Sequence, residues 1–222
     1  MSSPTFAVSP VAPELANKKT IFRLLYLLLF AWLVVLGVLA LVGFFADFSS
    51  LPPRMAFVPL LPLPVVLLLA RSKMGKYLIY HIRPQWFIYL QSFRILVEIG
   101  LWALVHNGML PVQLSFEGRN FDILVGLLAI PVGYFSVVRK IWPSWIVLAY
   151  NIFGLLMLVN VVSIAFLSMP TPLRIFPGQA DASLVAHFPL IYLPGVLVPL
   201  AYSLHIFSIR QWVLGRRRFQ IS

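Results

Sequence analysis

The sequence predicts an all-α fold, a polytopic membrane helix bundle of six transmembrane helices with both termini on the cytoplasmic side. Three observations support this expectation. Of the 222 residues, 61% are hydrophobic and only 10% are charged, whereas a soluble domain is about 45–50% apolar and about 25% charged. The chain also contains long stretches without any charged residue, and its Lys and Arg residues alternate between two sets of loops.

The charge-free stretches are long enough to cross a bilayer. They cover residues 24–46, 141–173 and 182–209. A spanning helix needs about 20 apolar residues, because the hydrocarbon layer is about 30 Å thick and each helical residue rises about 1.5 Å. Backbone polar groups cannot stay unpaired in lipid, so these stretches are expected to be helices.

The expected spans divide the chain into a short tail (residues 1–20), a six-span domain (21–209) and a basic tail (210–222). The first apolar run is too long for the core of a signal peptide, which has about 7–15 residues. The second span is the weakest, because it is short and its three prolines each remove a helical hydrogen bond. The spans are expected at about 21–45, 55–70, 86–105, 121–138, 145–167 and 188–209.

The basic residues predict the orientation. Six spans place thirteen Lys and Arg residues on one side, three on the other and one, Arg94, inside a span. Cytoplasmic loops carry the excess of Lys and Arg, so the thirteen are expected to face the cytoplasm. Those thirteen are Lys18, Lys19, Arg23, Arg71, Lys73, Lys76, Arg83, Arg139, Lys140, Arg210, Arg216, Arg217 and Arg218; the opposite three are Arg54, Arg119 and Arg174.

The partners expected from composition are lipids. The net charge of +11 does not indicate nucleic acid, because the basic residues form short clusters between apolar runs. These clusters, above all Gly215–Arg218, are expected to attract anionic lipid at the cytoplasmic side. The chain has no Cys, which excludes disulfides and thiolate metal ligands.

An intramembrane polar site is expected on the third span, where Arg94 and Glu98 lie four residues apart on one helix face and can form an ion pair. Gln91 extends this face. Ionised groups near mid-membrane cost roughly 2.5–3.5 kcal/mol on insertion scales, so they usually face the bundle interior and mark function. The alternative is a structural ion pair that fixes helix packing.

The depth of the other spans suggests neighbours for this site. Asn151 on the fifth span and Tyr202 on the sixth are expected at a similar depth, although ordinary interhelical hydrogen bonds would explain both. His205 is expected to be hydrated near the inner interface. A second group, the outer-rim polar cluster, surrounds the start of the fourth span, where a capped helix N-terminus is a sufficient explanation. Its members are His106, Glu117, Arg119, Asn120 and Asp122.

Two segments carry a resemblance to a known family. They are Gln91–Glu98 and Phe116–Leu124, the second reading FEGRNFDIL. With residues 85–135 as a whole, they resemble an uncharacterised bacterial family of multi-pass membrane proteins that has no assigned activity. The resemblance implies a bacterial inner membrane and nothing about mechanism.

Three functions stay open. The first is transport of a small molecule or ion through the central polar site, with Arg94 attracting an anion and Glu98 carrying a proton. The second is a non-catalytic accessory or scaffold subunit, held to a protein partner or to a second copy of the chain. The third is a membrane-embedded lipid-modifying enzyme that uses Glu117, Asp122 and His106. No catalytic motif, cofactor motif or diagnostic metal-ligand spacing is present, so no catalytic residue, cofactor or metal is expected.

Overall fold

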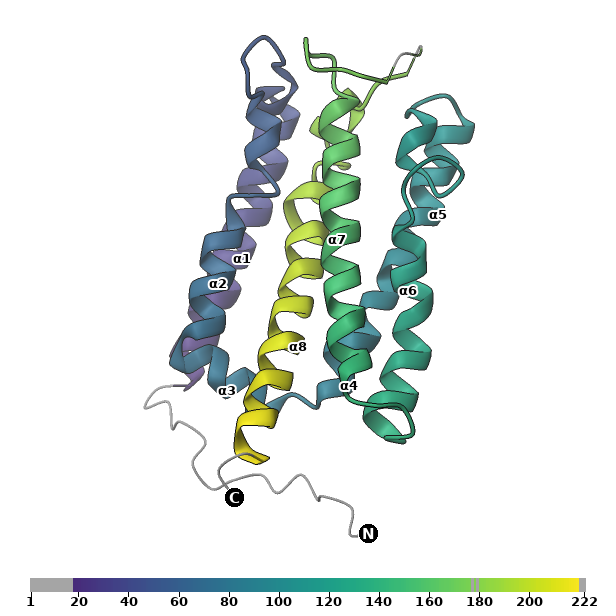
Figure 1. The fold of residues 1–222 in the computed structure, drawn as a ribbon. Helices are drawn as coiled ribbons and strands as arrows, with labels where there is room; N and C mark the ends of the chain where they lie inside the picture. Colours follow the sequence, from purple (N-terminus) through teal and green to yellow (C-terminus); the bar gives the residue numbers. More distant parts are fainter. Residues whose placement is uncertain (1–17, 177, 179, 220–222) are drawn as a thin grey trace.

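A computed structural model of the chain describes residues 18–176, 178 and 180–219, in which helices predominate and no strand occurs. Most of the expected N-terminal tail and the last three residues of the basic tail lie outside these ranges. The long helices run side by side in one elongated bundle (Figure 1). The helices are α1 (Lys18–Leu41), α2 (Pro62–Arg71), α3 (Lys73–His81), α4 (Pro84–Tyr89), α5 (Phe93–His106), α6 (Asp122–Pro131), α7 (Trp145–Leu167) and α8 (Val198–Phe219).

Short turns of other helical types join or extend these elements. A 3₁₀ turn links α4 to α5, and a π-helical segment, Val132–Val138, extends α6. A second π-helical segment, Leu193–Leu197, leads into α8. Pro131 precedes the first π-helical segment and Pro194 lies inside the second. A proline lacks the backbone N–H that continues an α-helical ladder.

Five helical segments are long and apolar enough to cross a membrane. They are Phe22–Leu41, Arg54–Arg71, Pro84–His106, Trp145–Leu167 and Leu193–Gly215, while the apolar helix Asp122–Val138 is shorter. The proline-rich second segment is therefore long enough to cross a membrane. Its Pro62 does not interrupt α2, because it occupies the first position of the helix, where a missing N–H costs nothing. The first span ends earlier than expected, because Gly43 adopts a positive φ of 74° after α1.

Two further expectations differ from the structure. The connection between the second and third spans contains the helix α3 instead of a loop, with Ser72 capping it by accepting a hydrogen bond from the Gly75 N–H. The last span begins at Leu193 instead of residue 188, because the preceding residues form a 3₁₀ turn, Ser183–Ala186, and an irregular connection.

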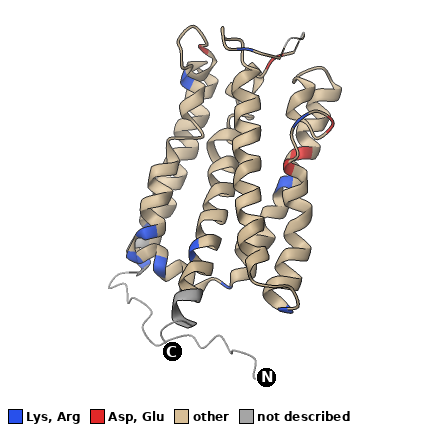
Figure 2. Cartoon of the chain, viewed as in Figure 1, with Lys and Arg blue, Asp and Glu red and all other residues tan. Residues whose placement is uncertain are grey.

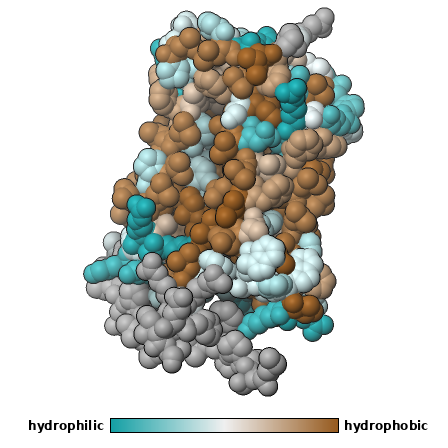
Figure 3. All heavy atoms as spheres, in the orientation of Figure 1, coloured by the Kyte–Doolittle hydropathy of each residue, from teal (hydrophilic) through white to brown (hydrophobic). Residues whose placement is uncertain are grey.

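Charge is distributed unevenly along the bundle axis. Lys and Arg gather mainly toward the end where α8 finishes, called here the basic end, and the described Asp and Glu lie in the other half (Figure 2). Apolar side chains cover much of the visible face between the ends (Figure 3). This distribution agrees with the grouping of basic loops that the sequence predicts, and the direction relative to the cytoplasm stays a prediction.

The helix α1 is attached through only part of its length. The Trp32 indole N–H donates to the Gly195 carbonyl over 2.8 Å, and the Tyr192 hydroxyl donates to the Leu33 carbonyl over 3.1 Å. Leu36 and Ala40 are buried in the same region. Nearer the basic end, the apolar side chains of residues 26–30 are all half exposed or more, so α1 packs firmly only in its second half.

Candidate functional site

The guanidinium of Arg94 is buried between helices, and its side chain is only 1% exposed. Its Nε lies 3.0 Å from Oδ2 of Asp122 at the start of α6. The two atoms form an ion pair without hydrogen-bond alignment. The expected pairing of Arg94 with Glu98 on the same helix is therefore wrong, because α6 supplies a nearer carboxylate than the next turn of α5.

Close packing of α5 and α6 produces this pairing. Gly126 lies against α5, where an added Cβ would come within 2.8 Å of the Ile95 side chain. The missing side chain lets the two helices approach, and Asp122 lies one turn before Gly126 on the same face. The long Arg94 side chain then reaches across the contact to the Asp122 carboxylate.

Glu98 is bound by Asn120 instead of Arg94. The Asn120 Nδ2 donates to Glu98 Oε1 over 2.5 Å and to the Leu114 carbonyl over 3.1 Å. Its Oδ1 accepts from the Asp122 backbone N–H over 3.2 Å. Asn120 thus connects the Glu98 carboxylate to the backbone at the start of α6, and we call Arg94, Glu98, Asn120 and Asp122 the central cluster.

Several polar atoms of the central cluster lack a hydrogen-bond partner among the described residues. They are all three guanidinium nitrogens of Arg94, Oε2 of Glu98 and Oδ1 of Asp122. A buried polar group without a partner costs about 1–3 kcal/mol, and a charged group costs more. Water, a ligand or a group beyond the described residues would therefore have to supply the partners of these atoms.

A cavity of about 560 Å³ lies beside the central cluster. Its volume falls in the range of about 300–1,000 Å³ that is typical of small-molecule sites. Arg94, Glu98 and Asp122 line it, and nearly all the remaining wall is apolar. That wall comes from residues 52–60, from α5, from residues 158–169 and from residues 193–201, so the cavity occupies the half of the bundle away from the basic end.

A second polar network closes the bundle nearer the basic end. The Asn151 Nδ2 donates to the Ser208 hydroxyl over 2.9 Å and to the Val147 carbonyl over 2.7 Å. The His205 Nδ1 lies 2.8 Å from Asn151 Oδ1, and Nδ1 donates this hydrogen bond because the amide oxygen can only accept. The expectation that His205 is hydrated is wrong, because its side chain is 0% exposed.

The other residues expected at mid-depth, Gln91 and Tyr202, do not bond to the central cluster. Gln91 donates from Nε2 to the Ala201 carbonyl over 3.0 Å and so joins the start of α5 to α8. The Tyr202 hydroxyl has no hydrogen-bond partner among the described residues and is not bonded to the central cluster. Tyr150, which the sequence did not single out, donates to the Val125 carbonyl over 3.0 Å and lies within electrostatic reach of Arg94.

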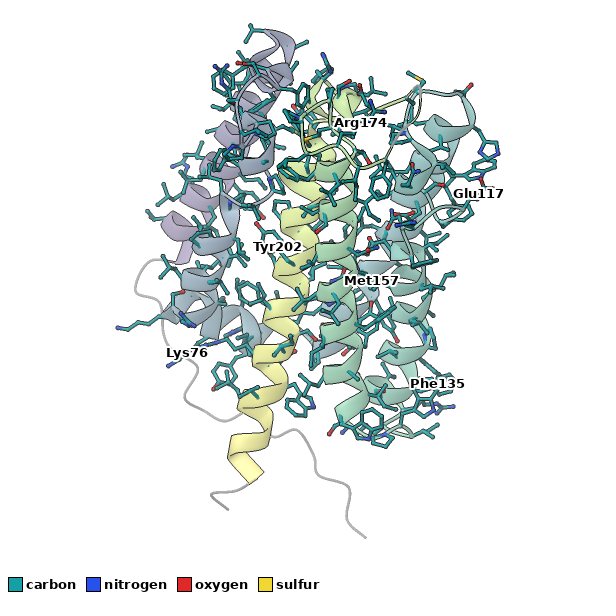
Figure 4. All side chains as sticks on the ribbon, turned by 45° about the horizontal axis from the view of Figure 1, so that its top comes forward. Lys76, Glu117, Phe135, Met157, Arg174 and Tyr202 are labelled. Atoms are coloured by element: carbon teal, nitrogen blue, oxygen red, sulfur yellow. The ribbon has the colours of Figure 1, made fainter. Side chains whose placement is uncertain are left out.

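The expected outer-rim cluster separates into a buried and an exposed part. Asn120 and Asp122 belong to the central cluster. Glu117 is exposed, accepts from the Trp102 indole N–H over 2.9 Å and lies 3.8 Å from the His106 ring. Arg119 lies over the Phe176 ring. Figure 4 shows Glu117 at the margin of the bundle, whereas Tyr202 lies on α8.

The ionisable groups of the rim do not converge with those of the central cluster. Among the described residues, no group of three or more His, Asp or Glu side chains is arranged to hold a metal ion. His106 and Glu117 contact each other, while Asp122 contacts Arg94. The three residues considered for lipid chemistry therefore share no common contact in this structure.

A family model described as a domain of unknown function, DUF8737, matches residues 60–213. The chain belongs to the DUF8737 family. No curated protein and no solved structure matches it. The DUF8737 domain contains the whole central cluster and the segment Phe116–Leu124, and it leaves α1 outside. Membership agrees with the expected resemblance to an uncharacterised family.

Proposed function

We propose that this DUF8737 protein is a multi-pass protein of the inner membrane that carries a small molecule through the central cluster. The observation that supports the proposal is the buried Arg94 guanidinium, which lacks a hydrogen-bond partner among the described residues and lines the cavity. A buried charge of this kind in an apolar bundle usually marks a substrate or ion pathway. Its unpartnered nitrogens are the groups that a substrate would satisfy.

The proposed topology has six spans, with both termini in the cytoplasm. The gathering of Lys and Arg at the basic end supports this orientation through the positive-inside rule. The helix Asp122–Val138 is the shortest of the six, and the bilayer accommodates short spans by local thinning at modest cost. The basic end is where we expect anionic lipid to bind.

The asymmetry of the bundle supports transport over a static pocket. The cavity lies on the side of the central cluster that faces away from the basic end. On the other side, the Gln91–Ala201 bond and the Asn151–His205–Ser208 network join the helices. We interpret the arrangement as one state of a carrier, with a cavity on one side of the central cluster and a seal of interhelical hydrogen bonds on the other, so transport requires the seal to open in a second state.

Cysteine labelling tests this proposal, because the chain contains no Cys of its own. Val97 lines the cavity, whereas its neighbour Leu96 is 73% exposed on the outer face of α5. In right-side-out vesicles, we expect Val97→Cys to react with a water-soluble maleimide at least about tenfold faster than Leu96→Cys, because water fills cavities with polar groups while lipid excludes it.

The seal provides the second half of the test. Ser208→Cys changes one atom in the network at the basic end, and we expect it to react slowly from the inner side, in inverted vesicles only. If Val97→Cys is as silent as Leu96→Cys, the cavity is dry and the proposal fails. If Val97→Cys reacts but Ser208→Cys never does, the protein binds a ligand without alternating access, and transport is ruled out.

An accessory or scaffold subunit is the second candidate, and the Arg94–Asp122 pair supports it. This pair joins α5 to α6, so it also serves as a packing contact. A purely structural pair predicts that replacing both residues with apolar ones leaves every function intact. It also predicts that the protein co-purifies with a partner or a second copy. A transporter with the same double substitution loses its activity.

A further inference from the structure

We infer that the cavity takes an acidic amphiphile, whose carboxylate or phosphate head binds Arg94 and whose apolar body fills the remaining space. This inference rests on the proposed function, because it names the class of molecule carried. It follows from three features of the site: the geometry of the free donors, the chemistry of the walls and the charge of the central cluster.

The unpartnered nitrogens of Arg94 indicate the chemistry of the head group. Both terminal nitrogens of Arg94 lack a hydrogen-bond partner among the described residues, whereas its Nε lies 3.0 Å from Oδ2 of Asp122, and the residue is 1% exposed. A guanidinium presents its N–H groups as a planar fork, which matches two oxygens of a carboxylate or phosphate. An arginine keeps its proton in proteins, so only an acceptor satisfies these groups.

The lining of the cavity indicates the chemistry of the rest of the ligand. Beyond the three charged residues, the lining consists almost entirely of apolar side chains, including Val97, Leu101, Val161, Phe166 and Leu197. Water in the cavity finds few hydrogen-bond partners on these walls and is readily displaced by an apolar group. An acyl or isoprenoid chain that displaces it gains about 25 cal/mol for each Å² of apolar surface removed from water. All polar recognition is concentrated at the Arg94 end, so a molecule with one polar head and one apolar tail matches the site.

The charge of the central cluster predicts that one proton is taken up when an anion binds. Asp122 already balances Arg94, and an anionic head would add a second negative charge beside Glu98. One proton taken up by Glu98 at Oε2 removes this repulsion, since Oε1 accepts from Asn120 while Oε2 has no partner among the described residues. The protonated Oε2–H then donates to the head group. Binding of one anion with one proton leaves the net charge of the site unchanged.

The experiment uses the purified full-length protein in micelles and a long-chain fatty acid with a nitroxide near the end of its chain. Its immobilised spectrum reports binding. Competitors share one alkyl chain and differ in the head: carboxylate, phosphate, sulfonate, alcohol or quaternary ammonium. We expect the carboxylate or the phosphate to compete at least about tenfold better than the alcohol and the ammonium compound, because hydrogen bonds to charged groups are the strong ones. The stronger of the two acids distinguishes a free fatty acid from a phosphate-headed lipid.

Substitutions assign the binding to the cavity. Arg94→Gln is expected to weaken binding about 10- to 100-fold, the loss that charged hydrogen bonds predict. Glu117→Gln, which neutralises the exposed carboxylate at the rim, is the matched control and is expected to change nothing. The sulfonate stays ionised at all working pH values, so its affinity should fall as pH rises in the unmodified protein and become independent of pH in Glu98→Gln.

Three outcomes overturn the inference: equal competition by all heads, tighter binding of the ammonium compound, or unchanged affinity in Arg94→Gln. If Arg94→Gln does not fold, the competition series on the unmodified protein still tests the inference through the first two outcomes. Acid-selective binding combined with an unreactive Ser208→Cys would show a protein that binds an acidic amphiphile without transporting it. The labelling test can therefore exclude transport while the competition series still supports the ligand class.

Discussion

Arg94→Met is expected to lower the free energy of unfolding by about 3–5 kcal/mol, the cost of breaking a buried ion pair by removing one partner. The substitution keeps most of the side-chain volume but leaves the Asp122 carboxylate in an apolar interior without its cation. Titration of the purified protein with a denaturing detergent, followed by the loss of helix or of tryptophan fluorescence, measures the change.

Two controls separate the pair from its individual charges. Arg94→Met combined with Asp122→Leu removes both charges and should recover most of the lost stability, because apolar replacements of a buried pair are often neutral or stabilising. Arg54→Met breaks the exposed pair with Asp47, whose side chains are 47% and 35% exposed, and should cost less than about 1 kcal/mol. If Arg94→Met proved as mild as Arg54→Met, the Arg94–Asp122 pair would contribute no more to stability than an exposed ion pair.

Gly154→Ala is expected to destabilise the protein by about 1–3 kcal/mol, the usual cost of overpacking a core. A Cβ at Gly154 would overlap the imidazole of His205 on α8, and this ring is fixed by Asn151. The ring cannot move away without breaking that bond, so the strain falls on the contact between α7 and α8. Thermal unfolding of the solubilised protein reports the loss.

The matched control is Gly100→Ala, in the helix α5. A Cβ there meets no atom of the described residues within 4 Å, so the higher helix propensity of Ala should stabilise the protein by up to about 1 kcal/mol. Combining Gly154→Ala with His205→Ala should restore part of the stability by making room for the methyl group. Equal effects of the two glycine substitutions would show that α7 and α8 are not in close contact at this point.

Apolar run length was sufficient to predict where most helices lie. The fifth expected span, residues 145–167, coincides with α7, because no proline or charge interrupts it. The second and last spans were harder, since prolines there are compatible with a helix only at particular positions. Pro62 is harmless at the first turn of α2, and a π-helical segment surrounds Pro194, but composition alone does not reveal either arrangement.

The central cluster was predicted only in part. Spacing along one helix identified Arg94 and Glu98 as buried, and both are. Spacing could not identify Asp122 as the partner of Arg94, because that contact depends on how α6 is positioned against α5 at Gly126. The same limitation applies to His205 and Ser208: their separation by three residues places them on one face, but only the packing of α7 shows that Asn151 meets them.

The match to the family begins at residue 60, and this boundary divides the cavity wall. The polar end, with Arg94, Glu98 and Asp122, lies inside the shared domain. Part of the apolar wall, including Pro52, Met55 and Phe57, lies before it. The residues proposed to bind the acidic head therefore belong to the family domain, while part of the wall proposed to contact the apolar tail lies before the matched residues.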